Sequence, residues 1–166
     1  MRTKTSLRFL LLLALYSCND IPQHITTGLE GNPLPAIDLL LPDSITHINT
    51  KDASKGTPTV LMYVDPDCRF CRAQLTELKS KISQLHNIQF YIFTETSIAR
   101  TRRLEKSLPI NGFRNLYLGI DTQNTFVSMF NPPGYPYTAV YRVDRKLHAV
   151  FLGQTDLTRI EKAATD

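Results

Sequence analysis

Apolar and polar positions recur along the chain with two different periods, and together they predict an α/β domain. Thr59 to Val64, TVLMYV, is an apolar run with β-branched residues, which is typical of a strand buried on both faces of a sheet. After it, apolar positions recur at spacings of three and four, which predicts an amphipathic helix over 68–86 with Asp67 as its N-cap. A second buried strand, 88–94, completes a βαβ unit, whose two strands we expect to be parallel.

The remaining elements extend this unit on both sides. Two short β-like runs, AIDLLL and ITHIN, are separated by a Pro-Asp-Ser turn and predict an initial hairpin. Downstream, the pattern predicts these elements in order: helix 97–108, strand 115–120, helix 122–130, strands 137–143 and 147–153, and helix 156–164. The chain of 166 residues is long enough for one domain that buries its own core.

The N-terminus does not belong to this pattern. MRTKTSLR is basic, and the apolar run FLLLLALY that follows has eight residues, whereas a spanning helix needs about 20. This combination predicts a secretory signal. Residues 19–33 contain Pro, Gly and polar residues without a sustained period, which predicts a tether between the signal and the domain.

The end of the apolar run carries a more specific pattern. LYSC, Leu15 to Cys18, resembles the lipobox of bacterial lipoproteins, in which the cysteine is lipidated and becomes the first residue of the mature chain. The resemblance implies a signal peptide at 1–17, a lipidated tether at 18–33 and a domain at 34–166. A plain signal peptide that happens to contain a cysteine is the alternative.

The net charge changes once the signal is set aside. Residues 1–17 carry three cations and no acid, so the rest of the chain has 16 basic and 15 acidic residues. A nucleic-acid partner is therefore not predicted. The run RTRR, Arg100 to Arg103, is interpreted as the solvated face of a helix in preference to an anion-binding patch.

If Cys18 carries lipid, a single pair of cysteines remains for redox chemistry in an oxidising compartment, Cys68 and Cys71. The pair follows a strand and opens a helix, where unpaired backbone N–H groups and the helix dipole favour a thiolate at the first cysteine. We therefore expect Cys68 to attack and Cys71 to resolve the mixed disulfide.

Charged neighbours act on Cys68 in opposite directions. Asp65 and Asp67 disfavour a thiolate, whereas Arg69 and Arg72 favour one. Because the two effects oppose each other, the sequence predicts a reduction potential in the middle of the known range.

These segments resemble a known family. TVLMYV leading into CRFC, and GYPYTAVYRVDRKLHAVFLGQTD far downstream, resemble the thioredoxin superfamily over about residues 31–164, most closely its membrane-anchored TlpA-type thiol:disulfide oxidoreductases. The resemblance implies a thioredoxin fold, with a central mixed β-sheet flanked by helices, an N-terminal β-hairpin and an extra helix and strand at 97–120. It also implies that Pro136 is a cis-proline across from the dithiol, and that Tyr135 offers backbone groups to an extended substrate. A rigid loop is the alternative for these prolines.

The chain also departs from that family. It has no Trp, and Asp67 stands where thioredoxins usually carry Trp before the first cysteine. Met62 replaces a buried acid that relays the proton of the resolving thiol, so Cys71 would need water or another carboxylate. A non-catalytic thioredoxin-like binding module of the cell envelope is therefore the alternative function.

Metal and peroxide chemistry fit the sequence less well. Structural zinc takes four ligands, and no histidine lies at ligand spacing from the cysteine pair, so no metal is predicted, although a copper chaperone remains open. Haem attachment needs Cys-x-x-Cys-His, and residue 72 is Arg. DPDC lacks the Pro and Thr pattern of peroxiredoxins. A purely structural staple is disfavoured because a loop this short removes little chain entropy.

The predicted function is thus a lipid-anchored thiol:disulfide oxidoreductase of the cell envelope that faces the periplasm. The resemblance favours the reductase direction, with electrons from a membrane donor and no cofactor other than the redox-active disulfide Cys68–Cys71. Its predicted partners are exported thiol or disulfide proteins, with apocytochrome c as one candidate, and the protein is expected to be a monomer.

Overall fold

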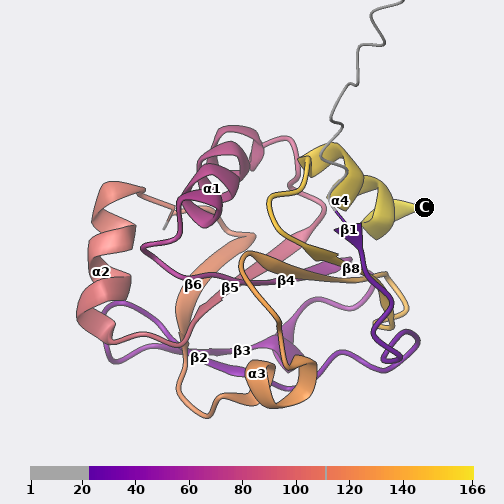
Figure 1. The fold of residues 1–166 in the computed structure, drawn as a ribbon, viewed down its shortest axis with the longest axis horizontal. Coiled ribbons are helices and arrows are strands. Elements are labelled where there is room, and N and C mark those ends of the chain that lie inside the picture. Colours follow the sequence, from indigo (N-terminus) through magenta and orange to yellow (C-terminus); the bar gives the residue numbers. More distant parts are fainter. Residues whose placement is uncertain (1–22, 111) are drawn as a thin grey trace, which may run out of the picture.

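The computed structural model describes residues 23–110 and 112–166, which build a mixed β-sheet with helices on both faces (Figure 1). The strands are β1 (Gln23–His24), β2 (Asp38–Leu40), β3 (His47–Asn49), β4 (Thr59–Tyr63), β5 (Gln89–Thr94), β6 (Leu116–Asp121), β7 (Tyr137–Tyr141) and β8 (Leu147–Leu152). The helices are α1 (Arg69–Lys81), α2 (Ile98–Ser107), α3 (Thr125–Phe130) and α4 (Leu157–Thr165), with a short 3₁₀ helix at Thr50–Asp52. The strand order is β1-β8-β7-β4-β5-β6-β2-β3.

The centre of the sheet confirms the predicted βαβ unit. Strands β4, β5 and β6 run parallel, and α1 and α2 form the connections between them. On the other side of β4, the hairpin of β7 and β8 is antiparallel. The predicted thioredoxin fold is therefore confirmed, including the N-terminal hairpin β2–β3, which pairs with β6, and the extra helix and strand α2 and β6.

The two faces of the sheet bury different side chains. Helices α1, α2 and α4 cover one face, where the core is mostly aliphatic and includes Cys71, Leu75 and Leu104. The short helix α3 covers the other face, where aromatic rings predominate, among them Tyr63 and Phe126, whose ring centroids lie 5.1 Å apart. Because every residue of β4 is buried, this strand has the continuous apolar pattern read from the sequence.

Two predicted boundaries of α1 are wrong. The helix ends at Lys81 and not at residue 86, and the chain continues in turns although Ile82 and Leu85 remain buried. The N-cap is Cys68 and not Asp67, since the Cys68 Sγ accepts the N–H of Cys71 whereas the Asp67 carboxylate pairs with Arg100 of α2.

The first described residues pack on the sheet. Strand β1 pairs with β8, the Gly31 N–H donates to the Leu147 carbonyl at 2.8 Å, and Leu29 packs against the aromatic core. Residues 23–33 thus contribute contacts to the sheet, and the division of the chain at residue 34 stays a prediction. The predictions for residues 1–22, including lipidation of Cys18, lie outside the described residues. Within the described part, no helix is long and apolar enough to cross a bilayer.

Candidate functional site

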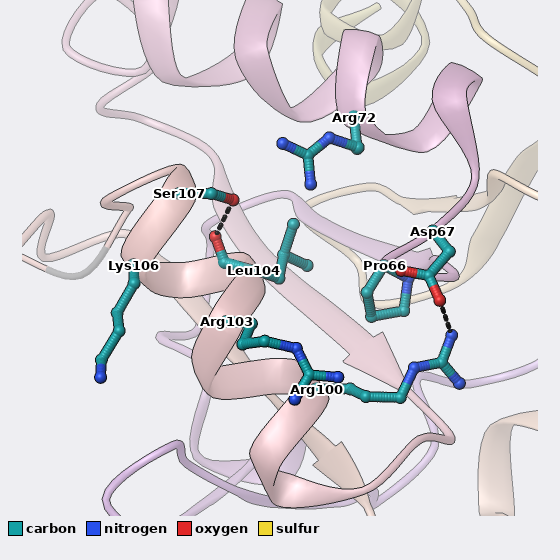
Figure 2. Close-up of a pocket in the computed structure, with 8 residues that line it drawn as sticks. All are labelled: Pro66, Asp67, Arg72, Arg100, Arg103, Leu104, Lys106 and Ser107. Carbon is teal, nitrogen blue, oxygen red and sulfur yellow. Dashed lines mark hydrogen bonds and ion pairs between the residues drawn. The ribbon is translucent and has the colours of Figure 1, made fainter.

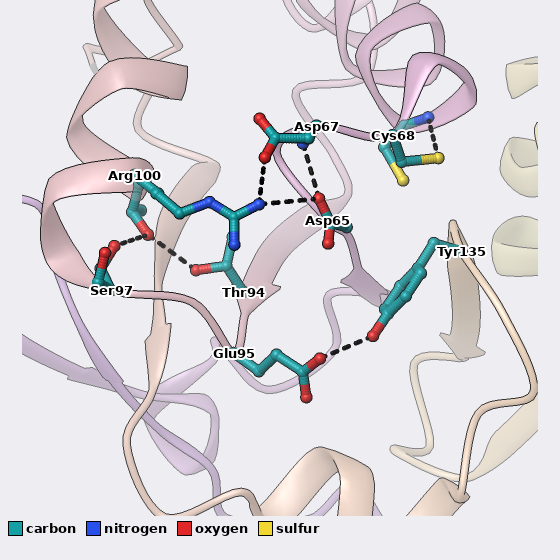
Figure 3. A network of polar contacts seen from close by, with 10 residues as sticks. Asp65, Asp67, Cys68, Thr94, Glu95, Ser97, Arg100 and Tyr135 are labelled. Carbon is teal, nitrogen blue, oxygen red and sulfur yellow. Dashed lines mark hydrogen bonds and ion pairs between the residues drawn. The ribbon is translucent and has the colours of Figure 1, made fainter.

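The site begins where β4 ends. A tight turn follows Tyr63, in which the Asp65 carbonyl accepts the N–H of Cys68 at 3.1 Å. Helix α1 starts directly afterwards, and the Cys68 Sγ accepts the N–H of Cys71 at 3.4 Å, within the range for sulfur (Figure 3). An otherwise unpaired amide of the first helical turn therefore points at the first sulfur, which is the geometry that stabilises a thiolate.

The two thiols differ in their surroundings. Cys68 is partly exposed, whereas Cys71 is 0 % exposed and belongs to the aliphatic core with Val64 and Leu75. Burial raises the pKa of the Cys71 thiol well above its usual range, and the neighbouring Cys68 sulfur adds to the rise. Both cysteines are free thiols in this structure, so near neutral pH Cys71 keeps its proton while Cys68 is the accessible sulfur.

The loop that precedes β7 meets the cysteines at the same end of the sheet. Tyr137, the first residue of β7, pairs with Tyr63, the last residue of β4, so the chain segments beyond them emerge together. The peptide bond between Tyr135 and Pro136 is cis, as the family resemblance implies. The Pro136 carbonyl accepts the Gly153 N–H at 2.8 Å, which ties this loop to the end of β8.

A polar network lies around Cys68 (Figure 3). Arg100 of α2 forms ion pairs with Asp67 and, at 3.5 Å, with Asp65. On the other side of the site, the Tyr135 hydroxyl donates to Glu95 at 2.8 Å. The two carboxylates predicted to disfavour a thiolate are therefore compensated by a cation from another helix.

Sequence reasoning missed Arg100 and Glu95 as site residues. Arg100 lies 33 positions after Asp67, and no local spacing connects them. Glu95 offered a usable signal, because it directly follows β5, whose parallel pairing with β4 brings the carboxyl ends of both strands to one edge of the sheet.

The predicted arginines have different positions. The Arg69 guanidinium lies 4.6 Å from the centroid of the Phe70 ring, and Phe70 is 47 % exposed. The Arg72 side chain extends from α1 toward α2 (Figure 2). Both residues lie in the first turn beside Cys68, but their predicted effect on its thiolate stays a prediction.

The sequence places Met62 where the resembling family carries a buried acid near Cys71, and the turn before α1 contains another carboxylate, that of Asp65. Met62 is fully buried and places no charge there. After burial and Cys68, the groups that act on Cys71 belong to Asp65: its backbone N–H lowers the pKa of the thiol, and its carboxylate raises it. The Asp65 carboxylate thus has an electrostatic effect on the Cys71 thiol. Among the described residues, no group of three or more His, Cys, Asp or Glu side chains is arranged to hold a metal ion.

No family model and no curated protein matches the sequence. Solved structures do match the fold. A secreted disulfide oxidoreductase of Mycobacterium tuberculosis, described as homologous to DsbE of E. coli, is 15% identical with a TM-score of 0.64, over 77% of this chain and 93% of that chain. A putative thiol:disulfide interchange protein DsbE from Chlorobium tepidum is 13% identical with a TM-score of 0.67, over 81% and 94%.

A third match is the pneumococcal exposed lipoprotein thioredoxin Etrx1 from Streptococcus pneumoniae. It is 17% identical with a TM-score of 0.63, over 77% of this chain and 99% of that chain. At identities this low, the matches establish a thioredoxin-like fold.

Proposed function

We propose that this thioredoxin-fold domain is a thiol:disulfide oxidoreductase that reduces disulfides in exported proteins. The observation that carries the proposal is the contrast between its two thiols. Cys68 is accessible at the N-cap of α1 and receives a backbone N–H, while Cys71 is buried and held protonated one turn further on. Dithiol exchange needs an accessible thiolate that attacks the substrate and a second, protonated thiol that later resolves the mixed disulfide.

The exchange runs in two balanced steps. The Cys68 thiolate attacks one sulfur of a substrate disulfide, the substrate S–S bond breaks, and the leaving thiolate takes up a proton. Cys71 then loses its proton and attacks the Cys68 sulfur, which releases the second substrate thiol and leaves a Cys68–Cys71 disulfide. Two electrons pass from the dithiol to the substrate, and the chemistry uses no cofactor beyond these sulfurs.

The surrounding residues have defined roles in this proposal. Asp65 accepts the proton of Cys71, directly or through water, because its carboxylate raises the pKa of this thiol and it lies in the turn that leads into α1. The backbone of Tyr135 and the cis-Pro136 hold an extended substrate segment against Cys68, at the end of the sheet where both loops emerge.

The cellular setting belongs to the same proposal. The signal and lipobox-like residues would anchor the protein through a lipid on Cys18 at the periplasmic side of the envelope, where a membrane dithiol donor recharges it. Two of the matching structures are described as a secreted disulfide oxidoreductase and an exposed lipoprotein thioredoxin, which supports this setting by analogy of fold. Exported disulfide proteins, with apocytochrome c as one candidate, are the proposed substrates.

Mixed-disulfide trapping tests the reaction. Cells that express Cys71→Ser should accumulate covalent complexes between Cys68 and exported proteins, visible on non-reducing gels and lost on reduction. The double variant Cys68→Ser, Cys71→Ser is the matched control and should form none. Equal complex formation by both variants would refute the assignment of Cys68 as the attacking thiol.

Fatty-acid labelling tests the anchor. Radioactive palmitate should label the wild type and not Cys18→Ala, and equal labelling of the two would refute the lipoprotein proposal.

A further inference from the structure

A groove of about 530 Å³ lies next to the dithiol, where α1 faces α2 (Figure 2). Its lining includes four cationic side chains, Arg72, Arg100, Arg103 and Lys106. Asp67 is the one carboxylate among the described residues that line it, and Leu104 points into the space between the helices. The lining therefore carries a formal charge of +3.

Most of this charge is not compensated within the described residues. Arg100 pairs with the two aspartates of the turn, but Arg72, Arg103 and Lys106 form no ion pair in this part of the chain. These three side chains are exposed. Cations gathered on one surface attract a partner of opposite charge.

The other side of α2 is different. There Arg102 donates to the Pro42 carbonyl, and Asp43 and Glu105 add negative charge beside it. Lys106 lies at the edge between the two sides, since it lines both hollows. The excess of positive charge on α2 is thus confined to the side that faces the dithiol. A helix that is basic only for solubility would not need its cations on one side.

The position and length of the groove suit a polypeptide. One end is Asp67, the residue before Cys68, and the Arg72 N–H bonds to the Cys68 carbonyl at 3.0 Å. Positions 100, 103 and 106 lie one turn apart along α2, a span of about 9 Å at the helical rise. In an extended segment, side chains on one face repeat about every 7 Å, so two carboxylates match this span.

We propose that the groove binds an acidic, extended segment of the protein that exchanges its disulfide at Cys68, and so selects partners with Asp or Glu near the reacting cysteine. The cations on α1 and α2 can bind several carboxylates of one peptide at once. A single phosphate would reach only some of these cations. A flat lipid surface would contact only the outer rim of a recess between two helices, whereas an extended segment can lie along it. The inference rests on the proposed function for the identity of its occupant.

Peptide binding tests this without thiol chemistry. The protein is the full chain with Cys68 and Cys71 changed to Ser. The probe is a fluorescein-labelled peptide with three Glu beside a Ser that replaces the reacting Cys, and the control peptide carries three Gln. Anisotropy at 50 mM salt should show about tenfold tighter binding of the Glu peptide, as a few exposed ion pairs supply. At 500 mM salt the preference should fall below about threefold.

Charge reversal locates the binding. The variant Arg103→Glu, Lys106→Glu should lose the preference for the Glu peptide. The matched variant Lys51→Glu, Lys55→Glu changes the net charge equally at exposed positions before β4, at the opposite end of this strand from Cys68, and should keep it. Circular dichroism shows whether each variant is folded, and if the first is not, the salt and Gln-peptide comparisons decide.

Four results would overturn the inference: equal affinity for both peptides, equal losses in both charge variants, displacement of the Glu peptide by 5 mM inorganic phosphate, or binding of the wild type to vesicles of anionic phospholipid through Arg103 and Lys106. The outcome is separable from the proposed function. Peptide preference without trapped mixed disulfides would refute only the exchange reaction. Trapped complexes without a preference would refute only the acidic partner.

Discussion

The surroundings of Cys68 and Cys71 are opposite in kind although the two residues lie one helical turn apart. Cys68 borders a charged rim in which Arg100 compensates two carboxylates, and its sulfur receives a backbone N–H. Cys71 has no exposed surface and lies among aliphatic side chains. A single turn at the start of a helix therefore suffices to give two identical side chains different chemistry, because one turn carries the chain from the surface into the core.

The largest expected effect is a difference in alkylation rate. In the reduced protein at pH 7, iodoacetamide should modify Cys68 about 100-fold or more faster than Cys71, because burial both raises the pKa of the Cys71 thiol, which lowers its thiolate fraction, and blocks access of the reagent. Peptide mass spectrometry over a time course measures both rates in one sample. Similar rates would show that the two surroundings do not differ in the proposed way.

Truncation of a residue next to Cys71 should lower the free energy of unfolding more than truncation of a residue next to Cys68. Leu75→Ala removes a fully buried side chain one turn after Cys71 and should lower the free energy of unfolding by about 2–5 kcal/mol. Phe70→Ala, at a position 47 % exposed beside Cys68, should cost less than about 1 kcal/mol. Urea denaturation of both variants measures this, and equal losses would contradict the contrast.

Stability should also depend on pH through Cys71. Its pKa in the folded protein is raised above the ordinary value of 9.0, so the folded state keeps a proton that the unfolded chain releases. The stabilisation is present below pH 9 and lost above it, at a rate that approaches about 1.4 kcal/mol per pH unit. Urea denaturation of the reduced wild type between pH 8 and 11 should show this decline relative to Cys71→Ser, in which the buried thiol is absent. Parallel curves for the two proteins would contradict burial of the thiol.

The smallest expected effect concerns the charged rim. Arg100→Gln leaves two carboxylates without their cation and should slow alkylation of Cys68 about two- to fivefold at pH 7, the range that exposed charges produce. Asp67→Asn should change the rate in the opposite direction by a smaller factor, since this side chain is 78% exposed. Equal and unchanged rates in both variants would mean that the rim does not act on Cys68.

The buried surroundings of Cys71 could be predicted from the sequence. Strand β4 is buried on both faces and therefore has no polar alternation, and the spacing of three and four after it predicts a helix with one buried face, on which Cys71 and Leu75 lie. The spacing overran the helix end, because Ile82 and Leu85 stay buried in turns that follow Lys81. Apolar spacing indicates which residues are buried, and residues beyond the end of a helix can be buried as well, so the spacing alone does not fix the helix end.

The charged surroundings of Cys68 could be predicted only in part. The sequence identified the aspartates of the turn, but Cys68 is the N-cap because the Asp67 carboxylate pairs with Arg100, which lies 33 positions away in the sequence. Arg100 and Glu95 come from other elements and join the site only when the sheet forms. The groove beside Arg100 and Arg103 could not be predicted from the sequence either, since it depends on what α1 places opposite α2.

The most direct test of the central claim is the redox equilibrium of the full chain against dithiothreitol and glutathione buffers, with the thiols counted by alkylation and mass spectrometry. A reversible two-electron transition that involves both Cys68 and Cys71 is predicted, nearer the roughly −270 mV of thioredoxin than the roughly −120 mV of a strong oxidant. A value near the latter would contradict the reductase direction. The absence of any reversible transition would contradict dithiol exchange itself and leave a binding module in its place.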